Sequence, residues 1–175
     1  VEGLRQLGVR VEDGGRGTLP LSVVGTGTVP GGTVTIDASG SSQFVSALLL
    51  AAVRFESPLV LRHDAPGGVP SLPHVEMTLQ VLRDAGVSAE RVSEREWRVE
   101  PGAVAGLDVT VEPDLSNAGP FLAAAVATGG TVSIPDWPAH TTQGGDHWRH
   151  ILPSFGARVT VQNGVFTVTG PDQLQ

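Results

Sequence analysis

The sequence contains no cysteine and no lysine among its 175 residues. Without cysteine the chain can form neither a disulfide nor a thiolate metal site, and this composition fits a reducing compartment, so we expect a cytoplasmic protein. All 11 basic residues are arginine. Any chemistry that depends on an amine side chain must therefore come from outside this chain.

Long apolar runs and a basic surface are also missing. No apolar run reaches the roughly 18 residues that span a bilayer, and no signal peptide is visible at Val1. The formal net charge of -7 argues against a general surface for nucleic acid or acidic membranes. No Gly-x-Ser-x-Gly elbow is present, so a serine nucleophile is unsupported. The glycines within 25–32 precede a strand-like stretch instead of a helix, which disfavours a nucleotide-binding loop. We expect neither nucleic acid nor a membrane as a partner.

One stretch of the chain organises the rest. Thr33–Asp37 is rich in β-branched residues and predicts a strand, Ala38–Ser42 is a small-residue turn, and Gln43–Val53 is almost wholly apolar and predicts a helix. Ser41 and Ser42 therefore lie at a helix start, where backbone N–H donors are unpaired. Two interpretations stay open. The hydroxyls cap their own helix, or they join the N–H groups in binding an anion such as phosphate.

A second helix follows in the same pattern. Pro58–Arg62 predicts a strand, and Ser71 then stands as the N-cap of a helix that Gly86 ends. The apolar face of this helix consists of Val75, Leu79 and Leu82. The segment Glu90–Glu100 completes the unit, so the order of elements is strand, helix, strand, helix, strand, strand.

The same order of elements returns in the second half of the chain. The corresponding segments are a strand at Val109–Glu112, a helix at Phe121–Ala127, a strand at Thr131–Ile134, a helix at Asp146–Phe155 and a hairpin at Arg158–Val168 around Asn163-Gly164. The period of roughly 70 to 75 residues indicates repeated supersecondary units. Pro153 conflicts with the fourth segment, so that helix either ends near Ile151 or is kinked.

Three motifs resemble those of one enzyme family. They are Asp37-Ala-Ser-Gly-Ser-Ser-Gln-Phe-Val-Ser-Ala-Leu-Leu, Ser71-Leu-Pro-His and Pro113-Asp-Leu-Ser-Asn-Ala-Gly-Pro-Phe-Leu-Ala-Ala-Ala. The family is EPSP synthase (3-phosphoshikimate 1-carboxyvinyltransferase), and the likeness runs along essentially the whole chain. It implies an α+β fold of repeated βαβαββ units, the inside-out α/β barrel of the enolpyruvyl transferases, of which this chain would be a part. Residues 1–110 would form the C-terminal part of the first lobe, and residues 111–175 the first βαβαββ unit of the second.

The resemblance also implies an activity and a binding site. The family transfers the enolpyruvyl group of phosphoenolpyruvate to shikimate 3-phosphate, in aromatic amino-acid biosynthesis, with no metal and no organic cofactor. Carried over to this chain, Ser41, Ser42 and Ser71 are expected to bind the phosphate of shikimate 3-phosphate. Gln43 is expected to contact both substrates. His74 departs from the family pattern, because many members carry an aromatic hydroxyl residue there.

The resemblance places no catalytic residue in this chain. The Lys and Arg residues that grip phosphoenolpyruvate, and the acidic residue that transfers the proton, are expected before Val1 and after Gln175. The sequence has no initiator methionine and starts inside a predicted helix. We therefore expect a fragment that is inactive alone, and an intact enzyme that is a monomer.

Three other functions compete with this one. A UDP-N-acetylglucosamine enolpyruvyl transferase has the same repeated fold, but the Ser-Ser-Gln-Phe stretch at Ser41–Phe44 disfavours it. An RNA-phosphate cyclase of related fold is disfavoured by the acidic balance of charge. A non-catalytic domain would use Ser41, Ser42 and Ser71 only as helix caps.

A group of histidines is a candidate metal site. His140, His147 and His150 are close in sequence to Asp146, and His147 and His150 would share one helical face. A metal site needs three convergent ligands with supporting hydrogen bonds. We therefore expect these histidines to lie at the surface or to serve packing, and we expect no metal.

Overall fold

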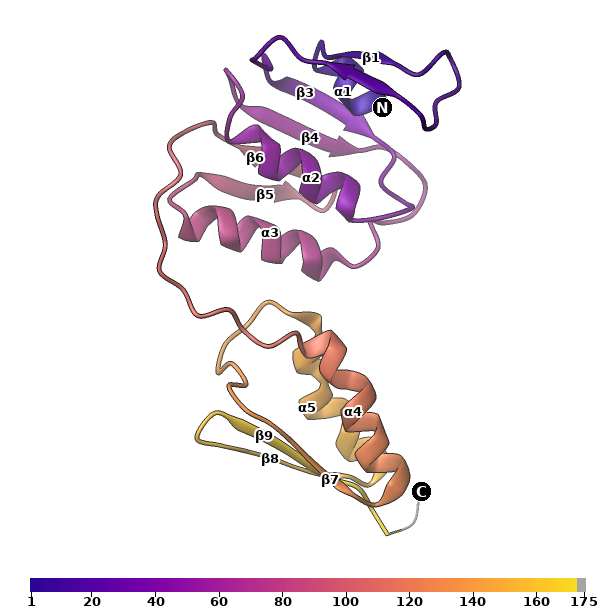
Figure 1. Ribbon diagram of the computed structural model, residues 1–175, viewed down its shortest axis with the longest axis vertical. Helices are drawn as coiled ribbons and strands as arrows, with labels where there is room; N and C mark the ends of the chain where they lie inside the picture. The colour runs from indigo at the N-terminus through magenta and orange to yellow at the C-terminus, as the bar shows by residue number, and fades with distance from the viewer. Residues whose placement is uncertain (173–175) are drawn as a thin grey trace. The chain divides into compact units, whose positions relative to one another are not determined.

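The computed structural model describes residues 1–172 of the chain. They fall into two compact units, residues 1–107 and residues 108–172 (Figure 1). Each unit has its own sheet and its own apolar core.

The first unit is built on a mixed four-stranded sheet. Its strands are β3 (Gly32–Ile36), β4 (Leu59–His63), β5 (Ala89–Ser93) and β6 (Glu96–Val99), in the order β3-β4-β6-β5. β3 and β4 are parallel, whereas β6 is antiparallel to both β4 and β5. A parallel pair needs a long crossover, which helix α2 (Gln43–Ala52) supplies, and helix α3 (Leu72–Asp84) connects β4 to β5. The expected order of six elements is confirmed.

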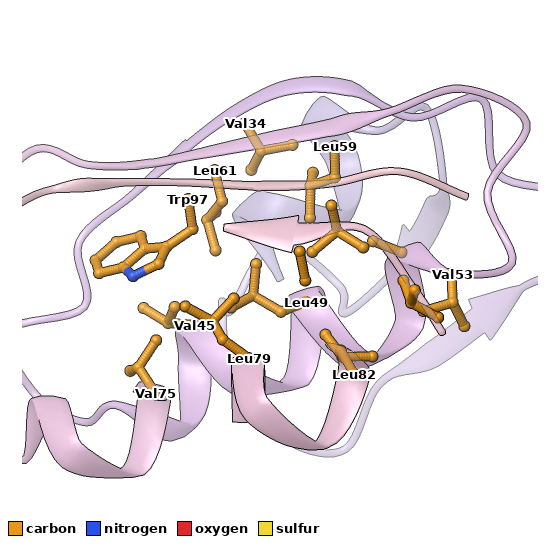
Figure 2. Packing of buried hydrophobic residues seen from close by; sticks show 14 of the residues in the cluster. Val34, Val45, Leu49, Val53, Leu59, Leu61, Val75, Leu79, Leu82 and Trp97 are labelled. Carbon is orange, nitrogen blue, oxygen red and sulfur yellow. The ribbon is translucent and has the colours of Figure 1, made fainter. Parts of the chain in front are cut away.

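The core of this unit lies between the sheet and the two helices (Figure 2). The expected apolar face of α3 is confirmed, because Val75, Leu79 and Leu82 are all buried. Helix α2 buries residues with the same spacing, and Trp97 of β6 is 0% exposed beneath both helices. The hydroxyl of Thr78 on α3 also donates to the Ser46 hydroxyl on α2 at 2.8 Å, which fixes the two helices side by side.

A short N-terminal segment lies beside β3. It consists of helix α1 (Glu2–Gln6) and an antiparallel pair of strands, β1 (Arg10–Glu12) and β2 (Ser22–Val24). The Gln6 side chain accepts a hydrogen bond from the N–H of Thr35 at 2.9 Å and donates one to the carbonyl of Thr35 at 2.8 Å. The amide of Gln6 thereby satisfies the outer edge of β3 in the way that a neighbouring strand would.

The second unit repeats the order of the first from its first long helix onward. Its elements are α4 (Leu115–Thr128), β7 (Thr131–Ile134), the 3₁₀ turn η1 (Gly144–His147), α5 (Trp148–Ile151), the 3₁₀ turn η2 (Leu152–Phe155), β8 (Arg158–Gln162) and β9 (Val165–Thr169). The sheet order is β7-β9-β8, with both pairs antiparallel. Asn163 and Gly164 have φ of 50° and 74°, as a type I′ turn requires, so the predicted hairpin is confirmed.

The strand expected at Val109–Glu112 is wrong. Residues 101–114 contain neither helix nor strand, and Val109 and Val111 are 67% and 86% exposed. The β-branched pattern of this segment is genuine, but β-propensity depends on a neighbouring strand and a covered face. In the described structure this segment pairs with none of the three strands of the sheet, although β7 and β8 each have a free edge.

Asp146–Phe155 does not form one α-helix, and the expectation that Pro153 ends the helix near Ile151 is confirmed. The α-helical part ends at Ile151, and Pro153 lies in the first turn of the 3₁₀ segment that follows. Proline has no N–H to donate to an α-helical bond, so the chain tightens at this point instead of continuing the α-helix.

Asp146 joins three parts of the second unit. One of its oxygens accepts hydrogen bonds from Nε1 of Trp137 at 2.8 Å and from Nε of Arg149 at 2.5 Å. The Trp137 ring in turn stacks on Phe166 of β9 with the ring centres 4.1 Å apart. Burial by itself raises the pKa of Asp146, but the hydrogen bonds from Arg149 and Trp137 outweigh it, so the pKa lies below its usual value.

The lowered pKa predicts acid sensitivity of the second unit. A carboxylate with a lower pKa in the folded state stabilises the fold above its unfolded pKa, and this stabilisation is lost as pH falls through the folded pKa. We expect Asp146→Asn to lower the urea midpoint of the second unit at pH 7 and to flatten its fall between pH 7 and pH 3. Asp108→Asn, which changes an exposed carboxylate of the same unit, is the control. Equal acid dependence in all three proteins would contradict the assignment.

Candidate functional site

The four residues expected to bind substrate lie in two loops of the first unit. Ser41, Ser42 and Gln43 lie where the loop after β3 enters α2, and Ser71 lies where the loop after β4 enters α3. Because β3 and β4 are parallel neighbours, both loops start at the carboxyl ends of these strands, and both helices start beyond those ends (Figure 1). The fold therefore brings two helix N-termini to one end of the unit.

The start of α2 leaves the Ser42 hydroxyl without a capping role. Ser42 occupies the N-cap position in a helical conformation, with φ of -61° and ψ of -20°, and its side chain makes no capping hydrogen bond. The hydroxyl of Ser41 accepts a hydrogen bond from the N–H of Gln43 at 3.2 Å. Ser42 is only 4% exposed, whereas Gln43 is exposed and Ser41 is half-buried.

The start of α3 has an unusual backbone conformation. Ser71 has φ of 51° and ψ of 46°, which is the left-handed region. A non-glycine residue in this region costs about 1–2 kcal/mol, and such residues occur often at binding sites. The exposed Ser71 side chain makes no capping hydrogen bond, although its carbonyl accepts one from the N–H of His74 at 2.9 Å.

A helix in the second unit shows what a capped start looks like in this chain. One carboxylate oxygen of Asp114 accepts hydrogen bonds from the N–H groups of Ser116 and Asn117, both at 2.9 Å, and Nδ2 of Asn117 donates to the other oxygen at 2.9 Å. Asp114 and Asn117 thus serve the start of α4, as an ordinary cap would. The expectation that the Ser71 side chain caps α3 is wrong, and so is the alternative that Ser42 caps α2. At the start of α2 the N–H of Gln43 is instead bound by the hydroxyl of Ser41, and neither Ser42 nor Ser71 makes a capping hydrogen bond.

The turn before α2 is held by groups that sequence patterns did not reveal. Asp37 accepts hydrogen bonds from the hydroxyl of Ser39 at 2.6 Å and from the N–H of Ser39 at 2.8 Å. Both bonds hold the pKa of Asp37 below its usual value, and the bond from the hydroxyl has the larger effect. His63, which is 4% exposed, accepts a hydrogen bond from the N–H of Ala38 at its Nδ1, at 3.1 Å. One signal could have found His63: it continues the alternation of buried Leu59 and Leu61 along β4, where a polar side chain is unexpected.

Of the candidate metal ligands in the second unit, His147 and Asp146 have other partners nearby. Nδ1 of His147 lies 2.8 Å from the carbonyl of Gly144, and Asp146 is paired with Arg149. Within residues 1–172 no three histidine or acidic side chains are grouped so that they could hold a metal ion. His74, at the start of α3, is exposed.

None of the helices in the described part of the chain is both long enough and apolar enough to cross a membrane.

Comparison with known proteins gives a consistent result. The sequence profile of EPSP synthase (3-phosphoshikimate 1-carboxyvinyltransferase) matches residues 1–175. A 3-phosphoshikimate 1-carboxyvinyltransferase from Kocuria rhizophila is 85% identical over 175 residues, which are 100% of this chain and 39% of the relative. The chain therefore spans well under half the length of that curated relative.

Solved structures share the fold. An EPSP synthase from Acinetobacter baumannii superposes with a TM-score of 0.68 at 24% identity, covering 95% of this chain and 37% of that one. A second structure of EPSP synthase from the same organism gives a TM-score of 0.66 at 25% identity over the same shares of the two chains. The enolpyruvyl transferase NikO from Streptomyces tendae gives 0.62 at 20% identity, covering 98% of this chain and 42% of that one.

The resemblance that the serine-rich motif and the repeated elements indicated is thus confirmed along the whole chain. The chain belongs to the EPSP synthase (3-phosphoshikimate 1-carboxyvinyltransferase) family.

Proposed function

We propose that this chain is part of an enzyme that transfers the enolpyruvyl group of phosphoenolpyruvate to shikimate 3-phosphate. The observation that carries the proposal is the 85% identity to a 3-phosphoshikimate 1-carboxyvinyltransferase over every residue of the chain. The reaction belongs to aromatic amino-acid biosynthesis, and we propose that it occurs in the cytoplasm, in an intact monomer, with no metal and no organic cofactor.

The chain's own contribution is proposed to be the phosphate site of shikimate 3-phosphate. Ser41, Ser42 and Ser71 supply hydroxyl donors, and Gln43 supplies an amide that contacts both substrates. Each helix N-terminus carries a partial positive charge of roughly +0.5, which favours an anion there. Neutral donors also avoid the desolvation penalty of a buried cation. The hydroxyls of Ser42 and Ser71 make no capping hydrogen bond, and this supports the role, because neither hydroxyl is used to start its own helix.

The rest of the active site is proposed to lie outside these residues. The reaction passes through a multiply anionic transition state that needs positive charges placed in advance, and this chain contains no lysine. We propose that residues 1–110 complete the first lobe of an inside-out α/β barrel of repeated βαβαββ units, and that residues 111–175 begin the second lobe. The purified 175-residue chain should then release no phosphate from phosphoenolpyruvate and shikimate 3-phosphate.

A full-length hybrid tests the proposal. In this hybrid, the Kocuria rhizophila relative carries these 175 residues in place of the segment that they match. It should bind shikimate 3-phosphate, measured by calorimetry, and release phosphate when phosphoenolpyruvate is added. Binding of UDP-N-acetylglucosamine in place of shikimate 3-phosphate would assign the chain to the sister enzyme.

The variant Ser42→Ala of the hybrid should weaken binding of shikimate 3-phosphate by about 10- to 100-fold, because a hydrogen bond to a charged group contributes about 1.5–3 kcal/mol. Its stability should change little, since the Ser42 side chain caps nothing. Ser88→Ala, at an exposed serine of the same unit, is the matched control and should bind normally. A loss of stability of about 0.5–2 kcal/mol with unchanged affinity would favour the capping alternative instead.

A further inference from the structure

Arg95 forms a two-point contact with the loop that leads to Ser71. Arg95 lies in the turn between β5 and β6, and its two terminal nitrogens donate to the carbonyls of Ala65 at 3.0 Å and Gly67 at 2.9 Å. Both carbonyls belong to the loop 64–70, and this loop ends at the left-handed Ser71. A guanidinium donates such paired bonds in one fixed geometry, so the contact restrains the direction of the loop as well as its position.

The loop has little else to hold it. Its sequence is Asp-Ala-Pro-Gly-Gly-Val-Pro, and Val69 is its one buried residue. Gly67 has φ of 89°. A glycine in a free chain has many other backbone conformations available, so holding it in this one costs entropy. Without the Arg95 contact, ordering this segment would depend on its ends and on one valine side chain, against a large loss of chain entropy.

His63 holds the second loop and is joined to Arg95. Its Nδ1 accepts from the N–H of Ala38, and its own backbone N–H donates to the carbonyl of Arg95 at 2.9 Å. Because Nδ1 accepts, Nε2 must carry the proton of the neutral ring. Nε2 is buried without a hydrogen-bond partner among the described residues. The unpaired Nε2–H lowers the stability of the fold, and an aliphatic side chain at position 63 would avoid this loss. The hydrogen bond from the Ala38 N–H to Nδ1 offsets it.

We propose that Arg95 and His63 are positioning residues for the phosphate site. Arg95 holds the loop that presents Ser71, and His63 holds the turn that presents Ser41 and Ser42. The hydrogen bond from the His63 N–H to the Arg95 carbonyl connects the two residues, so the contacts that hold the two loops are linked. The inference rests on the proposed function, since it names what orients the donors of that site; neither residue contacts the substrate.

A role in general stability fits Arg95 less well. The side chain is exposed, and its hydrogen-bond acceptors are the two loop carbonyls. The carboxylate ion pairs of residues 1–172 do not include it. Exposed side chains of this kind contribute little to the free energy of unfolding. Its removal should therefore disturb the loop far more than the fold.

The test uses the full-length hybrid and three arginine variants. Arg95→Ala should raise the KM and the Kd for shikimate 3-phosphate by about tenfold, because small displacements of binding groups are costly. Arg95→Lys keeps the charge without the paired geometry and should fall in between. Arg54→Ala, at an exposed arginine beyond α2, is the matched control and should behave as the unaltered hybrid. Melting temperatures of all three should agree within a few degrees.

Position 63 supplies a second arm that separates positioning from packing. His63→Asn places an amide oxygen near Nδ1 and should retain most of the affinity for shikimate 3-phosphate. His63→Leu fills the space without an acceptor and should weaken binding by about tenfold. The melting temperature should change little, because the unpaired N–H of Ala38 that the variant leaves replaces the unpaired Nε2–H that it removes. Equal affinity of the two variants, or lost affinity that tracks lost stability, would overturn the role of His63.

Hydrogen exchange of peptides from residues 64–72 measures how firmly the loop is held, independently of enzyme activity. Arg95→Ala should speed exchange there about three- to tenfold relative to Arg54→Ala. Unchanged exchange overturns the inference, and so does faster exchange with unchanged affinity in a hybrid that binds shikimate 3-phosphate. If the unaltered hybrid neither binds it nor turns over, the proposed function fails, and the exchange result alone decides whether Arg95 holds the loop.

Discussion

Replacing Trp97 by alanine should lower the free energy of unfolding of the first unit by about 3–5 kcal/mol. The indole is 0% exposed and packs between the sheet and the helices α2 and α3, near Val45, Val75 and Leu79 (Figure 2). Truncation removes the largest fully buried side chain of the unit and leaves a cavity that the two helices can close only partly.

A second substitution at the same position separates volume from polarity. Nε1 of Trp97 is buried with no hydrogen-bond partner in the described part of the chain. Trp97→Phe removes that unpaired donor together with part of the ring, so the two effects oppose one another, and the loss should be about 1–2 kcal/mol. Phe44→Ala, which truncates a 54% exposed ring of α2, is the control and should cost under about 1 kcal/mol.

Urea unfolding followed by circular dichroism measures these losses. The expected order of stability is Phe44→Ala, then Trp97→Phe, then Trp97→Ala. A Trp97→Ala protein as stable as Phe44→Ala would mean that the core shown in Figure 2 does not carry this unit.

Replacing Gly31 by alanine should be comparably damaging, by about 2–5 kcal/mol, for two separable reasons. Gly31 has φ of 84°, where an L side chain is strained by about 1–2 kcal/mol. An added Cβ would also overlap the carbonyl oxygen of Ser57, which is backbone and cannot turn aside. Overpacking of this kind costs about 1–3 kcal/mol. The site is a corner where the chain entering β3 meets the chain entering β4, tied by the Gly32 N–H donating to the Pro58 carbonyl at 2.8 Å.

Two other glycines of the same segment separate backbone strain from steric overlap. Gly32 has φ of 109°, and an added methyl group there would meet open space, so Gly32→Ala measures the strain alone. Gly25 has neither a positive φ nor a close neighbour, and Gly25→Ala should be neutral or slightly stabilising. Unfolding in urea should rank the three as Gly25→Ala, Gly32→Ala, Gly31→Ala. If Gly31→Ala and Gly32→Ala cost the same, the overlap with Ser57 contributes nothing.

Sequence patterns predicted correctly those elements whose formation depends on interactions between residues close together in the chain. The Asn163-Gly164 dipeptide determined a hairpin because its two positive φ angles are available cheaply to these residues. Pro153 ended an α-helix because it lacks an N–H. In both cases the cause lies within a few residues of the effect, so the sequence alone contains it.

The failures have non-local causes. Val109–Glu112 has the composition of a strand but pairs with none of the described strands, and pairing depends on the rest of the fold. An ordinary cap was expected at Ser71, whereas its left-handed backbone follows from the loop that enters it. Arg95 reaches loop carbonyls 28 and 30 residues away, and His63 reaches Ala38 25 residues away. Periodicity cannot reveal contacts of that separation.

The amide of Gln6 has a consequence for how the first unit can meet other proteins. Both backbone hydrogen-bonding groups of Thr35 are occupied, so a foreign strand cannot dock along the middle of β3 without first displacing that side chain. At the opposite border of the sheet, β5 is interrupted by an irregularity between Arg91 and Ser93, which spoils the even spacing that a growing fibril needs. Both borders of this sheet are therefore poor templates for the addition of a foreign strand.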